Sequence, residues 1–330
     1  LTGARAAATM PRIDVWYGAR QRFGHLGVPQ RWVNILGAVS PAERVAKIEY
    51  RLNGGEARPL AKGPDLRRLA SPGDFNIDID REDLREGENT VAIRAVAGDG
   101  AAAEAEVTVE YEAGARWPLP YEVDWSKVDK IQDAAQVVDG QWRLENGGVR
   151  TVVPYYDRVL AFGDVNWTDY AATVEVTFHG FPGKRPGGPH FNVNHAGIGL
   201  RWRGHADDGK QPRVQWYPLG AATEFTLEKD LTQCRWRILP GPPGRPEWAE
   251  QPYAIELGRP YLLKGEVRTM PDGRNRYRTK IWSPDRNELD FWAVESFEEP
   301  SEDFASGSML LVAHNADVTF GKLTIEPLVQ

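Results

Sequence analysis

The sequence has little sulfur and no long apolar run. Its single cysteine, Cys234, cannot form a disulfide within the chain, and we expect it to be a small buried hydrophobe in the strand-like segment 234–238. No run of 18 apolar residues is present, so we expect no transmembrane helix and no membrane insertion. Only 3 methionines and few runs of Ala, Leu or Lys argue against a helical bundle.

The sequence also lacks an excess of positive charge and the loops of nucleotide enzymes. The net charge is −7, which argues against a general nucleic-acid binder. We therefore expect no nucleic-acid partner. No glycine-rich phosphate loop follows a strand, and no Ser-His-Asp elbow is visible. Nucleotide enzymes and α/β-hydrolases are therefore not expected, and neither is an organic cofactor.

Strict alternation of apolar and polar residues is the main positive signal. Segments 169–179, 197–203 and 262–268 each place apolar side chains on one side and Arg, His, Glu or Lys on the other. Period-two alternation is typical of a strand with one buried face. With 33 Gly and 24 Pro to form turns, the chain is predicted to be all-β, and polar sheet faces of this kind suit a polar polymer such as a polysaccharide.

The turn signals divide the chain into two predicted sandwiches. Two prolines and a glycine interrupt any regular element between them. We expect 1–10 to be a disordered or processed N-terminus, 11–112 the first domain, 113–120 a linker and 121–330 the second domain. The small-residue run 6–8 is typical of the end of a secretory signal region, so we expect a secreted or periplasmic bacterial protein.

The first domain carries a pattern of spaced glycine, asparagine and apolar residues between Leu84 and Gly98. Six or seven short strands over about 100 residues predict a small sandwich. The pattern resembles bacterial immunoglobulin-like or fibronectin type III-like modules, which implies an immunoglobulin-like fold and a supporting role. The residues that carry the resemblance are Leu84, Gly87, Asn89, Val91, Ile93, Ala95 and Gly98.

Four segments of the second domain carry another resemblance: 163–178, 197–205, 258–282 and 306–325. They resemble the concanavalin A-like lectin/glucanase superfamily, in the style of its laminin-G-like and keto-disaccharide-hydrolase-like members. The resemblance implies a jelly roll with a ligand groove on a concave sheet. It also implies a structural calcium ion, for which Asp317 is the expected ligand.

The polar alternates of the second domain are the expected groove residues, although alternation does not tell which of two sheets is concave. Arg and His side chains grip sugar hydroxyls or carboxylates, and aromatic faces stack on sugar rings. The clustering of arginine favours acidic glycans. The expected substrate-binding residues are Arg201, Arg203, Arg213, Gln215, Trp216, Tyr217, Lys264, Arg268, His190, Asn192 and His195.

Two carboxylates are the expected catalytic pair. A glycoside hydrolase places two carboxylates across the scissile bond, and strand logic favours Glu175 and Glu266, with Glu224 as a loop alternative and His179 as a third catalytic residue. The Glu-x-Asp-x-x-Glu signature of the glucanase branch is missing, because the corresponding strand reads RVQWY. Salt bridges on a solvated sheet are the alternative reading of the same carboxylates.

The function expected from the sequence is therefore a secreted polysaccharide-active protein. The leading version is a glycoside hydrolase that binds and cleaves a glycan in the groove. A polysaccharide lyase is an alternative, since His179, Tyr217, Lys264 and the arginines include the base and cation types that a lyase needs. A non-catalytic carbohydrate-binding or adhesion module is the third version.

Overall fold

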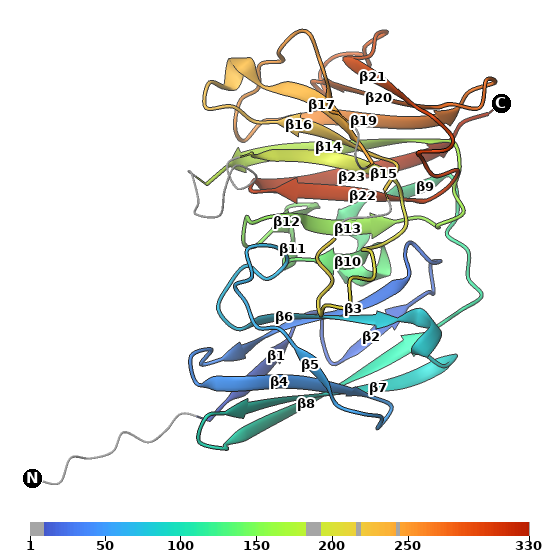
Figure 1. The fold of residues 1–330 in the computed structure, drawn as a ribbon. Coiled ribbons are helices and arrows are strands. Elements are labelled where there is room, and N and C mark those ends of the chain that lie inside the picture. Colours follow the sequence, from blue (N-terminus) through green and yellow to red (C-terminus); the bar gives the residue numbers. More distant parts are fainter. Residues whose placement is uncertain (1–9, 183–192, 216–218, 242–244, 330) are drawn as a thin grey trace, which may run out of the picture.

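The computed structural model describes residues 10–182, 193–215, 219–241 and 245–329. Within these residues the chain is all-β, as predicted. None of the described helices is long and apolar enough to cross a membrane. Figure 1 shows two stacks of sheets, one of blue and cyan strands below and one of green to red strands above. The short 3₁₀ helices are η1 (Arg81–Asp83), η2 (Trp125–Lys127), η3 (Ile131–Asp133) and η5 (Leu231–Gln233).

The first stack is a sandwich of a three-stranded and a five-stranded sheet. Its core is a cluster of buried apolar residues that includes Ile35, Ile77, Val91 and Val107. The strand orders are β1-β3-β6 and β2-β8-β7-β4-β5, and β2 runs parallel to β8. The immunoglobulin-like topology and the domain boundaries stay predictions. The strands are β1 (Arg12–Val15), β2 (Arg20–Phe23), β3 (Trp32–Ser40), β4 (Val45–Leu52), β5 (Arg58–Leu60), β6 (Asp74–Asp80), β7 (Gly87–Ala97) and β8 (Ala102–Tyr111).

The second stack is a sandwich of a seven-stranded and an eight-stranded antiparallel sheet. The orders are β10-β13-β22-β15-β16-β17-β18 and β11-β12-β23-β14-β19-β20-β21, and β9 pairs with β23. The largest hydrophobic cluster lies between these sheets. The strands are β9 (Tyr121–Val123), β10 (Gln136–Asp139), β11 (Trp142–Glu145), β12 (Gly148–Thr151), β13 (Arg158–Phe162), β14 (Tyr170–Gly180), β15 (His195–Trp202), β16 (Ala221–Thr226), β17 (Arg235–Pro240), β18 (Glu247–Trp248), β19 (Pro260–Thr269), β20 (Asn275–Trp282), β21 (Val294–Glu298), β22 (Ser308–His314) and β23 (Asp317–Pro327).

The alternation read from the sequence is confirmed in β14. Val174, Val176 and Phe178 are fully buried between the two sheets. Glu175 and Thr177, which alternate with them, are only partly buried and lie on the outer face of the eight-stranded sheet. β-Branched and aromatic residues pack well on a pleated, half-buried surface, which explains why this segment forms a central strand.

The alternation read from the sequence is wrong at the end of β15. Ile198 and Leu200 lie between the sheets, but Trp202 belongs to a separate apolar cluster on the outer face of the seven-stranded sheet. The register with β22 shifts between Gly199 and Trp202, and Arg201 adopts a φ of 53°. A bulge of this kind adds one residue and reverses the side-chain direction beyond it.

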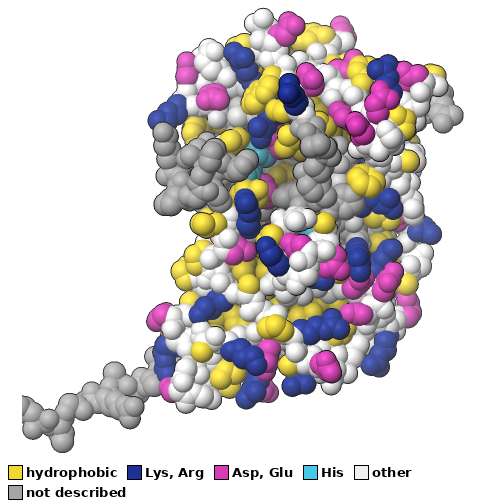
Figure 2. All heavy atoms as spheres, in the orientation of Figure 1, with side chains coloured by type: hydrophobic (Ala, Val, Ile, Leu, Met, Phe, Trp, Pro, Cys, Tyr) yellow, Lys and Arg dark blue, Asp and Glu magenta, His cyan; other side chains and the backbone are white. Residues whose placement is uncertain are grey.

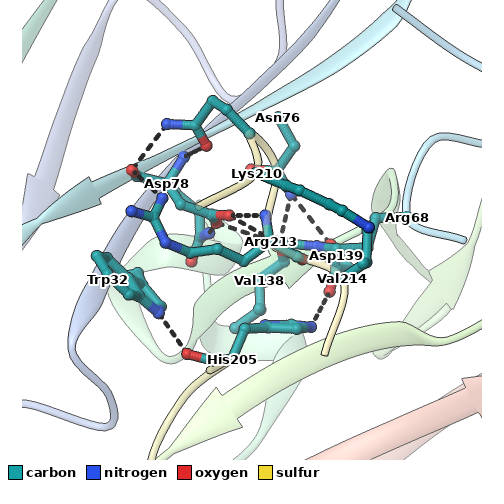
Figure 3. A network of polar contacts seen from close by, with 12 residues as sticks. Trp32, Arg68, Asn76, Asp78, Val138, Asp139, His205, Lys210, Arg213 and Val214 are labelled. Carbon is teal, nitrogen blue, oxygen red and sulfur yellow. Dashed lines mark hydrogen bonds and ion pairs between the residues drawn. The ribbon is translucent and has the colours of Figure 1, made fainter. Parts of the chain in front are cut away.

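A buried polar network joins the two sandwiches (Figure 3). Arg68, from the loop between β5 and β6, forms ion pairs with Asp78 of the first sandwich and Asp139 of the second, and all three side chains are 3 % exposed or less. Asn76 adds a hydrogen bond of 2.8 Å to the carbonyl of Val138. Burial lowers the pKa of Arg68, but the two carboxylates outweigh it and raise that pKa. The loop is thereby fixed at the junction by charge-assisted bonds.

Candidate functional site

The expected catalytic pair lies on the outer face of the eight-stranded sheet, but its two members are apart. Glu175 of β14 is opposite Leu262 of β19 in the register, and Glu266 lies four residues further along β19. Four residues of a strand span about 13 Å. Because the two carboxylates of a glycoside hydrolase lie roughly 5–10 Å apart, the structure does not bring this pair together.

Glu266 is also held by two cations. Arg278 Nε lies 2.7 Å from one carboxylate oxygen of Glu266, and a terminal guanidinium nitrogen of Arg276 lies 3.2 Å from the same oxygen. Glu266 is 4 % exposed. This arrangement corresponds to the salt-bridge reading of the sheet.

The other expected residues of this face are paired with neighbours as well. His179 Nε2 lies 2.8 Å from the hydroxyl of Thr319. Lys264 contacts Glu288 at 2.7 Å, and Arg268 donates to the carbonyl of Val329. These contacts stabilise the sheet and its edge loops.

The expected calcium ligand Asp317 faces a protein cation. Arg150 donates two hydrogen bonds of 2.9 and 2.8 Å to its carboxylate oxygens. The guanidinium therefore engages both carboxylate oxygens. As it lies, Asp317 does not fit a calcium site, which requires several oxygen ligands around one ion.

Arg201, Gln215 and Glu266, which we expected to converge, have different surroundings. Arg201 is fully buried and donates to Asp169, to Thr269 and to two backbone carbonyls. Gln215 is exposed in a loop, where its carbonyl accepts from the backbone of the segment after β15. The structure brings none of the three to a common hollow.

Two further expected residues lie near the first sandwich or on the surface. Arg213 stacks on the ring of Trp32 at 3.7 Å and bonds to Asp207 at 3.2 Å. Arg203 is exposed, 5.9 Å from the ring of Phe304. Four expected residues lie outside the described part of the chain, as does most of the predicted N-terminal segment 1–10. The four are His190, Asn192, Trp216 and Tyr217.

The outer face of the seven-stranded sheet carries a denser cluster of titratable groups. His195 of β15 and His314 of β22 are opposite each other in the register. Their rings stack with centroids 4.6 Å apart and an interplanar angle of 5°. Both residues are 5 % exposed or less. Figure 2 shows histidine atoms in a recess of the upper sandwich.

A carboxylate orients the second of these histidines. His314 Nδ1 lies 2.6 Å from an oxygen of Asp157, in the loop before β13. A neutral His314 that donates Nδ1–H to Asp157 carries its lone pair on Nε2. Tyr156 packs edge-on against the His314 ring at 4.7 Å. Burial raises the pKa of Tyr156 to about 12, and Asp157 acts in the same direction.

An acid and a cation lie on the other side of His195. One oxygen of Glu224, on β16, is 3.6 Å from His195 Nε2, and the other is bonded to Arg237 of β17. Burial raises the pKa of Glu224 and Arg237 opposes this shift. Burial also lowers the pKa of His195 well below its ordinary value, and His314 and Arg237 add to the decrease. His195 is therefore neutral at physiological pH.

A surface hollow of about 770 Å³ adjoins this cluster. Arg237 lines the hollow and also binds Glu224, so it connects the hollow to the titratable groups behind it. Asn194 and Thr226 lie on its wall, and Trp248 is 45 % exposed at its edge. Its volume is in the range of pockets that bind small ligands or a few sugar units. We call His195, His314, Asp157, Glu224 and Arg237 the histidine cluster.

Three members of this cluster are candidate metal ligands. Among the described residues, ligand atoms of Asp157, His195 and His314 lie within 4.8 Å of one another. Two imidazoles and one carboxylate suit zinc, whereas calcium takes oxygen ligands. However, the lone pair of an imidazole lies in its ring plane, and two parallel stacked planes do not meet at one ion. The rings as placed do not fit a metal, and we derive no step through one.

Comparison with known proteins gives distant structural likenesses only. No family model and no curated protein matches the chain. The alginate lyase Aly36B is similar at a TM-score of 0.41 and 12 % identity, over 64 % of this chain and 100 % of the lyase. The exoplasmic/lumenal domain of VIP36, in a form bound to Ca²⁺ and Man2, has a TM-score of 0.37 and 11 % identity, over 58 % of this chain and 80 % of the domain. A bifunctional GH43-CE protein of Bacteroides eggerthii has a TM-score of 0.42 and 11 % identity, over 90 % of this chain and 39 % of that protein. An activity has to be argued from the site itself.

The sequence reasoning found part of the histidine cluster. It named His195 as a substrate-binding residue and Glu224 as an alternative carboxylate, but it missed His314, Asp157 and Arg237. His314 follows Leu310 and Val312 on the same face of β22, so no polar alternation marks it. Asp157 lies outside any strand, and only the fold places it beside His314.

Proposed function

We propose that this protein binds an acidic polysaccharide on the outer face of the seven-stranded sheet and cleaves it by β-elimination. The observation that carries the proposal is the histidine cluster. Two stacked histidines are flanked by Asp157 on one side and by the Glu224–Arg237 pair on the other, next to a hollow. A lyase needs a positioned base, a proton donor and a group that neutralises the uronate carboxylate.

His314 is the proposed base. Asp157 holds its Nδ1–H, so Nε2 can take the C5 proton of a 4-linked uronate. The electron pair of that C–H bond forms the C4–C5 double bond, and the bond between C4 and the glycosidic oxygen breaks. His195, neutral and stacked on His314, adds no competing positive charge before the proton is transferred.

The Glu224–Arg237 pair is the proposed neutralising group. Arg237 lines the hollow and can bind the uronate carboxylate by charge-assisted hydrogen bonds. Glu224 holds the guanidinium of Arg237 in place through their ion pair. Withdrawal of charge from the carboxylate makes the C5 proton more acidic.

Tyr156 is the proposed proton donor. Its raised pKa keeps the phenol protonated at neutral pH, and its ring contacts His314. The leaving glycosidic oxygen takes this proton as the C–O bond breaks. Trp248, at the edge of the hollow, offers an exposed aromatic face for a sugar ring.

The test is incubation of the full chain with a panel of polyuronates and neutral glucans. The expected product is an unsaturated uronate, detected by its ultraviolet absorbance. His314→Ala should abolish its formation, whereas Glu266→Gln, on the other sheet, should retain it. Retention of a glycan on the protein without any product would support the binding-module alternative and contradict the catalytic proposal.

Hydrolysis is the second candidate function, because one observation favours it. The raised pKa of Glu224 is what a general acid of a glycoside hydrolase requires, and Asp157 is a second carboxylate beside the same histidines. New reducing ends without an unsaturated product would support this version. A secreted or periplasmic location, as expected from the sequence, would give either enzyme access to extracellular polysaccharide.

A further inference from the structure

The loop between β5 and β6 places two adjacent arginines in different environments at the junction of the sandwiches. Arg68 is buried in the polar network with Asp78 and Asp139. Arg67, the residue before it, is partly exposed, and its guanidinium lies 4.9 Å from the ring of Tyr156. A residue of the first sandwich thus contacts the proposed proton donor.

The position of Arg67 is well defined by its own loop. The carboxylate of Asp65 accepts the backbone N–H of Arg67 at 2.8 Å and that of Leu69 at 2.9 Å. The neighbouring Arg68 is bonded on both sides of the junction. A side chain on such a fixed turn can be held near a ligand at a small entropy cost.

Arg67 also lines a groove of about 970 Å³ between the sandwiches. Among the residues that the structure describes, its lining contains cations and carboxylates in equal number: Arg58, Arg67, Lys210 and Arg213 against Asp65, Asp78, Asp80 and Asp83. Figure 2 shows Lys and Arg side chains, interspersed with Asp and Glu, on this face where the two stacks meet. Arg67 contacts Tyr156 and Tyr156 contacts His314, so two side-chain contacts link the groove to the histidine cluster.

Most charges of the groove are paired within the protein. Asp78 bonds to Arg68, Asp80 to Arg31 and Asp83 to Arg58. Arg213 bonds to Asp207. In the parts of the chain that the structure describes, the side chains of Arg67 and Lys210 have no carboxylate within ion-pair distance. These two cations of the groove are left to an anionic ligand.

We propose that the groove between the two sandwiches extends the glycan site, and that Arg67 and Lys210 bind anionic groups of sugar units outside the histidine cluster. The inference rests on the proposed function, because it takes the acidic polysaccharide as ligand. The first sandwich then supplies substrate-binding residues in addition to support. Carboxylate and sulfate share the relevant chemistry.

The test is affinity electrophoresis of the full chain in gels that contain a polyuronate, dextran sulfate or a neutral β-glucan. The variants are Arg67→Gln, Lys210→Gln and the double variant. Arg20→Gln is the matched control: it removes the same charge from β2, at the opposite edge of the sheet from β5. We expect the double variant to bind the polyanions about tenfold more weakly, which corresponds to about 1.4 kcal/mol of binding free energy. Binding of Arg20→Gln should match the wild type.

Steady-state kinetics separate this inference from the proposed function. Lys210→Gln should raise KM on a long polyuronate and change kcat little, whereas His314→Ala should lower kcat. Unchanged polyanion binding by the double variant overturns the inference, while cleavage by the wild type would leave the proposed function standing. Weaker binding by the double variant with no cleavage by the wild type supports the groove and overturns the catalytic proposal. A wild type that binds no polyanion overturns both. If the double variant binds only one of the two polyanions more weakly, that polyanion identifies the anionic group, sulfate or carboxylate, that the two cations bind.

Discussion

His195 and His314 lie face to face on neighbouring strands, with their ring centroids 4.6 Å apart and their planes within 5°. Two protonated imidazoles at this distance would repel each other, so at most one of them carries charge. Burial keeps His195 neutral, and Asp157 bonds His314. The stacking therefore separates a neutral ring from one that can accept a proton.

Removal of the carboxylate that orients His314 should slow the reaction without unfolding the protein. For Asp157→Asn we expect kcat to fall about 10²- to 10³-fold, because the amide favours the wrong tautomer of His314 and general base catalysis contributes roughly 10²- to 10⁴-fold. The measurement is the initial rate of unsaturated uronate formation. Glu175→Gln is the control on the other sheet. Equal rates for Asp157→Asn and Glu175→Gln would contradict the role of Asp157.

Removal of Arg237 should destabilise the sheet by leaving Glu224 buried without its cation. We expect Arg237→Met to lower the free energy of unfolding by about 3 kcal/mol, as for other broken buried pairs. The double variant Arg237→Met, Glu224→Gln should recover much of this loss. Urea denaturation of the four proteins checks the prediction, and additive effects of the two substitutions would refute the coupling.

The junction should depend on Arg68 more than on exposed ion pairs. Arg68→Met leaves Asp78 and Asp139 buried without their shared cation, at an expected cost of about 3–5 kcal/mol. Arg58→Met, which removes the exposed pair with Asp83, should cost about 0–1 kcal/mol. Equal losses in urea denaturation would show that the buried network does not hold the junction.

Acid should destabilise the protein through its buried histidines. Burial lowers the pKa of His205 well below 6.5, with Arg68 and Arg213 adding to the shift, so below pH 6.5 the unfolded chain binds a proton that the folded chain does not. Its contribution to stability is therefore present above pH 6.5 and is lost as the pH falls. Asp139, whose pKa burial raises to about 7, acts in the opposite direction.

The difference between wild type and His205→Gln measures this contribution together with its coupling to Asp139, whose carboxylate lies 3.5 Å from His205 Nε2. Below pH 6.5 the free energy of unfolding of the wild type should fall more steeply, by up to about 1.4 kcal/mol per pH unit, which corresponds to one proton. Parallel curves of unfolding free energy against pH would mean that His205 is protonated in the folded state.

The strands could be predicted from the sequence much better than the site. In β14 and β19 the alternation predicts the buried and outer residues, because each strand has one apolar face. At Arg201 the prediction from alternation fails, because the sequence pattern does not reveal a bulge at an arginine in the left-handed backbone conformation. Alternation also shows which face of its sheet a side chain lies on, but not to which of the two sheets the strand belongs. Glu224, expected in a loop, lies on β16 beside His195, whereas Glu266 lies between two arginines on the eight-stranded sheet.

The most direct test of the account is a structure of the inactive His314→Ala variant with an oligouronate bound. The account predicts a uronate carboxylate beside Arg237, its C5 next to position 314, and further units that run toward Arg67. An oligouronate bound instead on the outer face of the eight-stranded sheet, near Lys264 and Glu266, would contradict it.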